Sequence, residues 1–276
     1  MSLLARNRPS QITDYPPPLT ISEEVYWRDY YEQSDTIYEW NNGILEEKPV
    51  SDYETFLIYS WFVNLLRLFL QTHPLASMTG LEMGFKLHLP NNKITVRKPD
   101  LGIVLKTNPV QLQHHDMRYH GVFDVCVEAL SDSTRKERER DTLIKKSEYA
   151  AAGIKEYLIL HHAEQQFYRL NESGVYVPMI PQNGVIRSQV LTGFQFRIAD
   201  LWNRPTEEKM IRDAVYRKFV FPAWQAVEQR AQIETELRRA AEQRAQIEAE
   251  FRRAAEERAA ALQTELDLLK LQGKKS

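Results

Sequence analysis

Acidic side chains inside apolar, strand-like segments are the first candidates for chemistry. Asp100 follows Pro99 in RKPDLGIVL, and Asp124 and Glu128 lie in VFDVCVEAL. Because side chains alternate along a strand, Asp124 and Glu128 share one face. Unpaired carboxylates are costly to bury, and a divalent cation would offset that cost. Mg²⁺ prefers a few carboxylates plus waters. The alternatives are a solvated sheet face or ion pairs, for which the nearby cations are Lys98, Arg135 and Lys145.

The helix expected after this segment carries a second polar set. Asp141, Lys145 and Tyr149 are spaced by four residues and therefore share one face. Another face is apolar or small and is formed by Leu143, Ile144, Ser147, Ala150 and Ala151. The polar face either meets solvent or lines a cleft beside the acidic strand. Periodicity does not decide between these positions, and Lys146, at the border of the apolar face, is a rival to Lys145.

The elements that must position these residues alternate in type. A helix begins at Ser22, a hairpin turns at Asn41-Asn42-Gly43, and a long apolar helix follows, capped by Ser51 or Asp52. Strand-like segments follow: LEMGFKLHL, KITVRKPDLGIVL and, after a polar loop at about 106–120, VFDVCVEAL. A helix capped by Asp132 or Ser133 runs to about residue 152, and further strands begin at IKEYLILHH. This order predicts a mixed α/β fold around one central sheet.

The composition limits the class of protein. The chain has 276 residues and a formal charge of −2, which argues against charge-driven DNA wrapping but does not exclude a nuclease. The single cysteine, Cys126, excludes a disulfide framework, and the histidines at 114–115, 120 and 161–162 fit no standard zinc motif. Without an apolar run of about 18–20 residues or a signal-like N-terminus, we expect a soluble cytoplasmic protein with no membrane partner.

The C-terminal region differs in composition from about residue 208. Residues 226–272 contain no glycine or proline, and a 14-residue pattern repeats at 227–240, 241–254 and 255–268. Spacings of four and three define a coiled-coil seam through Ile233, Leu237, Ala240, Ile247, Phe251 and Ala254. Arg230, Arg244 and Arg258 take one seam position in each repeat, and the seam shifts by one residue near Leu262. The pattern favours self-association or pairing with a partner helix over a long solvated helix on its own domain.

These observations divide the chain into three parts. We expect a flexible N-terminal arm at 1–19, a folded domain at 20–207 and a helical coiled coil at 208–276.

Several segments together resemble the Uma-two family of restriction endonucleases, in the PD-(D/E)XK nuclease superfamily. They are YEWNNGILEEKPVS (38–51), Pro99-Asp100, DVCVEALSDST (124–134), the Asp141, Lys145 and Tyr149 spacing, and AGIKEYLIL (152–160). The resemblance covers about residues 20–200. It implies a restriction-endonuclease-like core, with a central mixed sheet flanked by helices, and metal-dependent phosphodiester hydrolysis.

The resemblance also implies roles for individual residues. Asp100 and Glu128 would bind Mg²⁺ or Mn²⁺, Lys145 would join them as the catalytic amine, and Glu39 would be an additional ligand. The superfamily's usual lysine, two residues after the second acid, is replaced here by Leu130. His161-His162 stand where the family often has an aspartate.

The leading interpretation is a Mg²⁺-dependent endonuclease acting on DNA, with a C-terminal coiled coil. The alternative is a non-catalytic assembly protein built on a nuclease-like fold. A nuclease acting on RNA or single strands is a third possibility that no feature of the sequence separates from the first.

Overall fold

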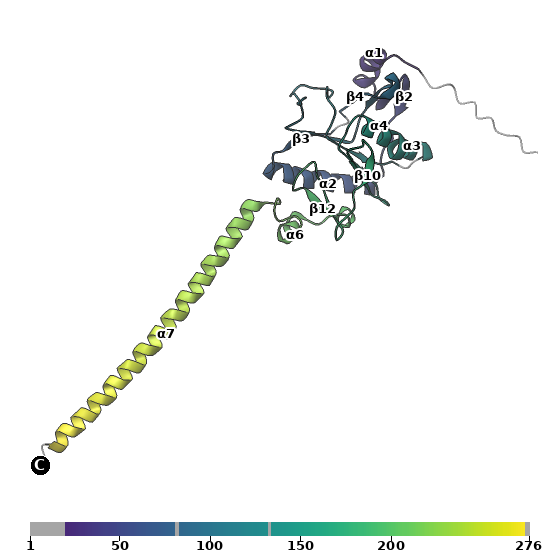
Figure 1. Cartoon of the computed structure of the whole chain (residues 1–276). Coiled ribbons are helices and arrows are strands. Elements are labelled where there is room, and N and C mark those ends of the chain that lie inside the picture. Colours follow the sequence, from purple (N-terminus) through teal and green to yellow (C-terminus); the bar gives the residue numbers. More distant parts are fainter. Residues whose placement is uncertain (1–19, 81–82, 132–133, 274–276) are drawn as a thin grey trace, which may run out of the picture. The chain divides into compact units, whose positions relative to one another are not determined.

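A computed structural model describes residues 20–80, 83–131 and 134–273 (Figure 1). Contacts divide the chain into two units, Met1–Val220 and Phe221–Ser276. The composition changes near residue 208, whereas the first unit continues to Val220. The expected arm at 1–19 lies outside the described residues.

A four-stranded antiparallel sheet forms the N-terminal part of the first unit, in the order β2-β1-β5-β4. Ser22 caps α1 (Glu23–Val25), which continues as the π-helical segment η1 (Tyr26–Tyr31). The hairpin of β1 (Tyr38–Asn41) and β2 (Ile44–Glu47) turns through Asn42 and Gly43, both at positive φ. β4 (Phe85–His88) and β5 (Ile94–Arg97) flank the short helix η2 (Pro90–Asn92).

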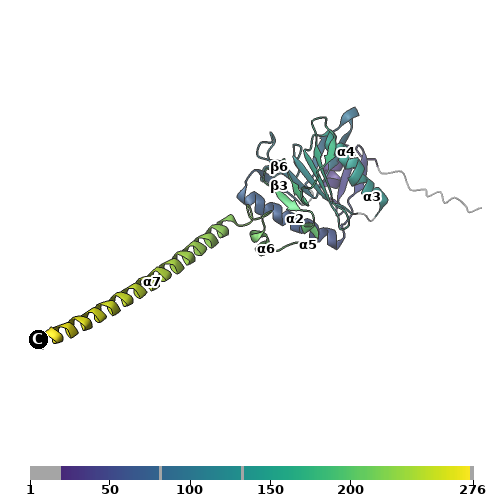
Figure 2. The same cartoon turned by 60° about the horizontal axis from the view of Figure 1, so that its bottom comes forward.

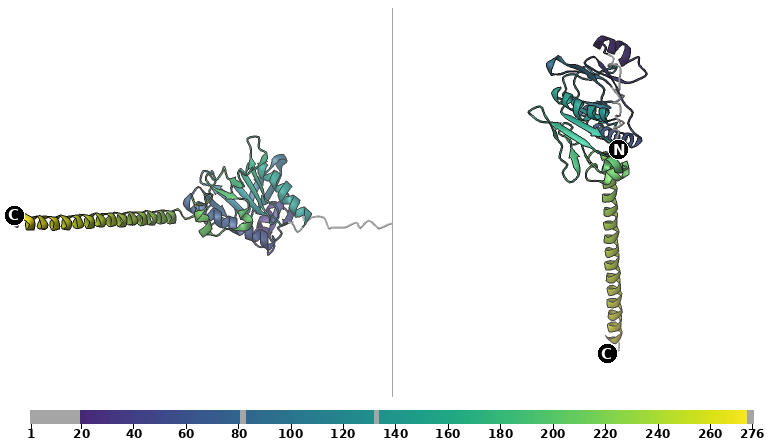
Figure 3. Two further views of the ribbon diagram at one scale, coloured as in Figure 1. Left: turned by 90° about the horizontal axis from the view of Figure 1, so that it is seen from below. Right: turned by 90° about the vertical axis from the view of Figure 1, so that its right-hand side faces the viewer.

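The central sheet has six strands in the order β10-β9-β8-β7-β6-β3. Its strands are β3 (Ala76–Thr79), β6 (Leu101–Leu105), β7 (Val125–Ala129), β8 (Glu156–Leu160), β9 (Gln166–Leu170) and β10 (Tyr176–Pro178). Only the β7–β8 pair is parallel among these strands, so the sheet is mixed. The strands fan out with the twist of an open sheet (Figure 3).

Helices cover both faces of this sheet (Figure 2). On one face, α2 (Tyr53–Thr72), capped by Asp52, packs with the hairpin of β11 (Val185–Arg187) and β12 (Gln195–Arg197). The helices α5 (Asp200–Asn203) and α6 (Glu207–Arg212) join the same core. On the other face lies the helix built from α3 (Arg135–Glu139), the π-helical η3 (Arg140–Lys145) and α4 (Lys146–Ala151). The mixed α/β class predicted from the element order is confirmed.

Two details differ from the expectations. The segment KITVRKPDLGIVL does not form one strand: it breaks at Lys98–Asp100, and β5 and β6 belong to different sheets. Pro99 lacks the N–H that a continuous ladder would need at the break. The predicted caps Asp132 and Ser133 lie outside the described residues, and Thr134 caps α3 through a capping box with Glu137.

The second unit consists mainly of α7 (Pro222–Gly273), a helix of 52 residues. No helix in the described ranges has the length and apolar character needed to cross a membrane.

Candidate metal and catalytic site

Glu128 lies on the buried face of β7 that meets the helix α3–η3–α4. Val125 and Val127 point into the core beside α2, so the alternating positions Cys126 and Glu128 point to the opposite face. Glu128 is 1% exposed. Its Oε1 accepts hydrogen bonds from Tyr149 Oη at 2.9 Å and Lys145 Nζ at 3.1 Å. The helix therefore presents its polar stripe to the acidic strand.

Lys145 joins three carboxylates. Its Nζ lies 3.1 Å from Glu39 Oε1, 3.1 Å from Glu128 Oε1 and 3.0 Å from Asp141 Oδ1. The side chain is 1% exposed. Burial alone would lower the pKa of Lys145, but the charges of Asp141, Glu128 and Glu39 outweigh it and raise that pKa well above its usual value. Lys145 is therefore held as a charged ammonium.

The structure separates the two candidate lysines of this helix. Leu143 and Ile144, on the apolar stripe, are 62% and 41% exposed, so it is the polar stripe that turns inward. Lys146 lies away from the carboxylates and places its Nζ 3.7 Å from the centre of the Tyr168 ring. Of the two, only Lys145 reaches the acidic strand.

Asp100 occupies the break between β5 and β6. Its Oδ1 accepts a hydrogen bond from Lys48 Nζ at 2.7 Å, and its Oδ2 accepts one from the backbone N–H of Ala129 at 2.6 Å. Because Ala129 follows Glu128 on β7, this second bond ties Asp100 to the strand that carries Glu128. Lys48, whose side chain is 7% exposed, also donates to the Lys98 carbonyl at 2.7 Å.

Glu39, on β1, completes the buried cluster. It is fully buried, and its Oε1 accepts a hydrogen bond from the backbone N–H of Lys98 at 2.9 Å. Its Oε2 lies 3.0 Å from Arg97 Nη1. Arg97 is also fully buried and pairs with Glu46 and Glu148 as well. The four-stranded sheet thus delivers Glu39 to the same lysine that meets Glu128.

Sequence reasoning missed Lys48, Arg97 and Glu148 as members of the cluster. A weak signal exists for Lys48, because it alternates with Glu46 at the end of the second hairpin strand. Arg97 ends the otherwise uncharged stretch ITVR, which is also an unusual place for a guanidinium. Their partners lie on elements far away in the sequence, so spacing alone could not have identified the pairs.

The charges of the cluster set the pKa values of its carboxyl groups in opposite directions. Burial raises the pKa of Glu128, the neighbouring charges of Asp100 and Asp141 raise it further, and the attraction of Lys145 and Lys48 only partly opposes this. For Glu39, burial would raise the pKa, but Lys145 and Arg97 outweigh it and hold the pKa well below the usual range. The pKa values of two buried carboxyls, Glu128 and Glu39, are thus shifted in opposite directions.

The donor set fits a hard divalent cation. Asp100 and Glu128 offer carboxylate oxygens from neighbouring elements, and Mg²⁺ takes one or two carboxylates and completes its shell with water. The charge of Asp100 raises the pKa of Glu128, and a cation between them would relieve this repulsion. Glu39, Asp100 and Glu128 do not, however, form a three-ligand group with all oxygens within 4.8 Å of one another among the described residues. The residues therefore fit a cation that is bound by the two carboxylates of Asp100 and Glu128 and completes its shell with water.

Other predicted residues lie outside the cluster. Asp124 is paired at the opposite end of β7, with Lys155 Nζ at 2.6 Å and the Leu105 N–H at 2.8 Å. Cys126 is fully buried, and burial raises the pKa of its thiol, so a reactive thiolate is disfavoured. Leu130, at the position of the superfamily's usual lysine, is 2% exposed in the core beside α4.

His161 and His162 meet the N-terminus of α2. His162 Nδ1 lies 3.1 Å from Asp52 Oδ2, and ligand atoms of Asp52, His161 and His162 all lie within 4.8 Å of one another. Asp52 is also the helix cap, and its Oδ1 accepts hydrogen bonds from the backbone N–H groups of Glu54 and Thr55. The pair of histidines is thus joined to a cap rather than to Lys145.

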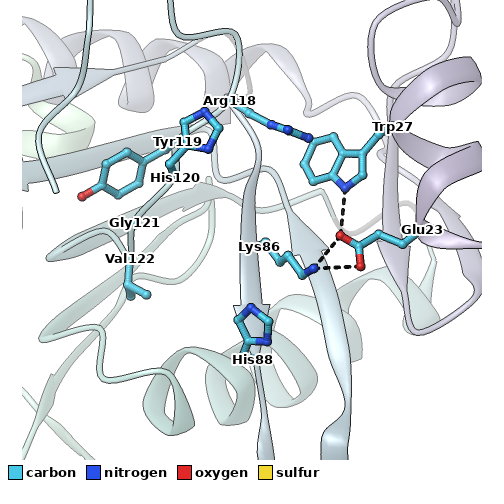
Figure 4. A pocket seen from close by; sticks show the side chains of 9 residues that line it. All are labelled: Glu23, Trp27, Lys86, His88, Arg118, Tyr119, His120, Gly121 and Val122. Carbon is cyan, nitrogen blue, oxygen red and sulfur yellow. Dashed lines mark hydrogen bonds and ion pairs between the residues drawn. The ribbon is translucent and has the colours of Figure 1, made fainter.

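A separate pocket of about 320 Å³ lies between α1, η1, β4 and the segment 118–122 (Figure 4). In it, Lys86 pairs with Glu23 at 2.7 Å, and Arg118 lies 4.3 Å from the centre of the Trp27 ring. Lys86 on β4 is paired with Val96 on the neighbouring strand β5, so their side chains lie on the same face of the sheet. Arg97 follows Val96 along β5, so its side chain points to the opposite face. This pocket is therefore on the other side of the sheet from Glu39.

A mixed sheet carrying acidic residues at a strand break and on the neighbouring strand, with a lysine from the following helix, is the arrangement expected from the resemblance to a nuclease-like class of protein. Comparison with known families matches residues 24–199 to Uma2, described as "Putative restriction endonuclease". The chain belongs to this family, as the sequence resemblance predicted, and membership supports a nuclease-like function.

Two further comparisons add little. A solved structure from Anabaena variabilis ATCC 29413, described as "a putative nuclease belonging to DUF820", shares 14% identity with this chain. The matched region covers 62% of this chain and 92% of the Anabaena chain, with a TM-score of 0.47. A likeness of this size says nothing about activity. No curated protein matches the chain.

Proposed function

We propose that this protein is an endonuclease that uses Mg²⁺ or Mn²⁺ to hydrolyse DNA phosphodiester bonds. Asp100 and Glu128 hold the cation, Lys145 is the catalytic amine, and Glu39 positions Lys145 or contributes a further oxygen. The observation that supports this most is the convergence of Lys145 Nζ on Glu128 and Glu39, beside an Asp100 that is bonded to the neighbouring residue of Glu128. The proposal thus concerns one buried, charged cluster.

The chemistry requires the negative charge of a phosphodiester to be offset. A bound divalent cation supplies neutralisation of the phosphate and a lowered pKa of a bound water. Lys145 contributes a fixed positive charge beside the acids, because its pKa is raised by three carboxylates. Lys48 contributes a second positive charge and orients Asp100 by donating to its Oδ1. Tyr149 orients Glu128 by donating to its Oε1.

The second candidate function is a non-catalytic assembly protein. The burial of Lys145 favours this function, because its ammonium lies within 3.1 Å of three carboxylates and is already engaged in ion pairs. In that case the cluster is a structural ion-pair network, and the nuclease-like fold carries α7 as its interaction element.

A cleavage assay separates the two functions. Purified full-length protein is incubated with supercoiled plasmid, single-stranded DNA and RNA, each with Mg²⁺, Mn²⁺ or a chelator. We expect cleavage of the plasmid with either cation and none with chelator. The RNA and single-stranded arms test the third possibility raised by the sequence.

Matched variants assign the activity to the cluster. Asp100→Asn, Glu128→Gln and Lys145→Met should each lower cleavage by about 100-fold or more, because each removes a charge from the site. Asp124→Asn is the matched control, because it changes an acid that lies on the same face as Glu128 but outside the cluster. This variant should retain activity, and its melting temperature verifies that it is folded. Activity that survives all three cluster substitutions would refute the assignment, and a total lack of cleavage in the wild type would favour the assembly function.

We also propose that α7 mediates self-association. The support is the 14-residue repeat, which places large apolar residues on one seam of a helix that otherwise consists mainly of Ala, Glu, Arg and Gln.

A further inference from the structure

The seam of α7 carries large apolar side chains that are exposed in the single chain. Ile233, Leu237, Ile247 and Phe251 are 57%, 66%, 54% and 74% exposed. Charges on the outer side of the helix are paired within the chain, as Arg238–Glu242 at 3.2 Å and Arg252–Glu256 at 3.6 Å. A helix with an uncovered apolar seam gains stability by burying that seam against another helix.

The arginines of the seam determine which pairing is possible. In heptad notation, Arg230, Arg244 and Arg258 occupy a positions, in alternation with Leu237 and Phe251. A parallel, in-register dimer places identical a residues opposite each other. It would therefore bury three Arg–Arg layers, and like charges held together at the seam are destabilising.

We infer that α7 pairs with α7 of a second copy of this chain in an antiparallel register that sets residue 230 opposite residue 254. This inference rests on the self-association proposed above. In an antiparallel pair, the a positions of one helix face the d positions of the other. Each arginine can therefore face an alanine, and each large apolar residue can face another large apolar residue. The facing pairs are Arg230–Ala254, Leu237–Ile247, Arg244–Ala240 and Phe251–Ile233.

Large and small residues complement each other in this register. An alanine leaves room for the aliphatic part of the facing arginine to cover the seam while its guanidinium reaches water. The apolar layers fall between the arginine layers, and the overlap spans residues 226–258, the whole seam before its shift near Leu262.

Neighbouring registers lose this complementarity. A slide of one heptad either way sets Arg244 and one of the other two arginines against isoleucines and sets Leu237 against an alanine. A slide of two heptads in one direction leaves residues 247–258 without a partner seam, and a slide in the other direction pairs Ile233 with position 265, beyond the seam shift. The 230–254 register is thus the one in which the unbroken seam pairs completely.

The register has a consequence for the folded units. The two copies of residue 226 lie about 32 helical residues apart along the rod, or about 48 Å at 1.5 Å per residue. The nuclease-like units are then attached near opposite ends of the paired segment.

Disulfide trapping in the full-length protein tests the register. Ile233→Cys and Phe251→Cys are prepared singly, one of them with a size tag, and are mixed under reducing conditions before oxidation. The native Cys126 is fully buried, and the wild type serves as the background control. We expect a disulfide between the two variants at least tenfold above the level of either variant alone.

Other outcomes overturn the inference in distinguishable ways. Self-linking of Ile233→Cys alone would indicate a parallel, in-register pair. Linking of Ile233→Cys to Ala240→Cys, but not to Phe251→Cys, would indicate a parallel pair staggered by one heptad. Sedimentation of the wild type as a monomer at all concentrations would refute self-association itself, whereas a dimer without the 233–251 link would refute only the register.

Discussion

Replacement of Lys145 by methionine removes the single ammonium that joins Glu39, Glu128 and Asp141. The three ion pairs have distances of 3.0–3.1 Å, and the lysine is 1% exposed. Breaking a buried ion pair by removing one partner costs about 3–5 kcal/mol, because the remaining charge is buried without compensation. At about 2–4 °C per kcal/mol for a domain of this size, the melting temperature should fall by about 6–20 °C.

The loss should depend on pH in a direction that the carboxyl groups dictate. Without the ammonium, the pKa of Glu128, already raised by burial, rises further. A carboxyl whose folded-state pKa is raised makes the folded state bind more protons than the unfolded state, so stability rises as pH falls. Differential scanning fluorimetry at pH 10.0, 9.0 and 8.0 should therefore show the gap in melting temperature between Lys145→Met and wild type narrowing as pH falls toward 8, because the pKa of Glu128 in the wild type is about 8 and below it both proteins bind the proton.

A matched control and a compensating change complete the experiment. Lys146→Met removes a neighbouring lysine whose ammonium lies over the Tyr168 ring, and it should cost about 0.5–1 kcal/mol. The double variant Lys145→Met with Glu128→Gln should recover part of the loss, since glutamine occupies the buried position without the proton uptake that Glu128 needs there. Equal melting temperatures for the Lys145 and Lys146 variants would refute the reasoning.

Three further predictions concern the cluster and the extent of the folded unit. Glu39→Gln should flatten the fall in stability at low pH. The lowered pKa of Glu39 contributes stability that is present above pH 4.5 and lost as pH falls below it. Melting temperatures between pH 3 and 7 would show this, and an unchanged dependence on pH in that range would contradict it. Tyr149→Phe removes the 2.9 Å hydrogen bond to Glu128 and should cost about 1.5–3 kcal/mol in urea unfolding, and a loss below 0.5 kcal/mol would count against it. A chain ending at Val220 should fold, whereas one ending at residue 207 should not, because it lacks four side chains that are at most 1% exposed (Met210, Tyr216, Phe219 and Val220). At about 1.5–3 kcal/mol each, their burial is comparable to the total stability of a domain; circular dichroism and sharp melting of the shorter chain would contradict the prediction.

The sequence predicted the strand that carries Glu128 and the helix that carries Lys145, because both have clear periodicity. Alternation along VFDVCVEAL placed Glu128 on one face with Asp124, and the four-residue spacing placed Asp141, Lys145 and Tyr149 together. The spacing could not tell which face turns inward. Leu143 and Ile144 suggested the opposite answer, but the ion pairs of Lys145 decided the orientation.

The partners of Asp100 and Glu39 could not be predicted for a different reason. Lys48 and Arg97 meet these acids only because two sheets are joined at the Lys98–Asp100 break. That junction depends on tertiary packing, whereas sequence periodicity reports only on local structure. The expectation of one continuous strand over KITVRKPDLGIVL failed at the same place, because an apolar segment interrupted by proline can continue a strand or start a new one.

The location of a bound cation tests the central claim most directly. Crystals of the full-length protein grown with Mn²⁺, measured at the manganese absorption edge, would reveal the ion by its anomalous scattering. We predict one strong peak within coordination distance of carboxylate oxygens from both Asp100 and Glu128, lost in Glu128→Gln. A peak at Asp52 and His162 instead, or none at the Asp100–Glu128 pair while the protein cleaves DNA, would contradict the account.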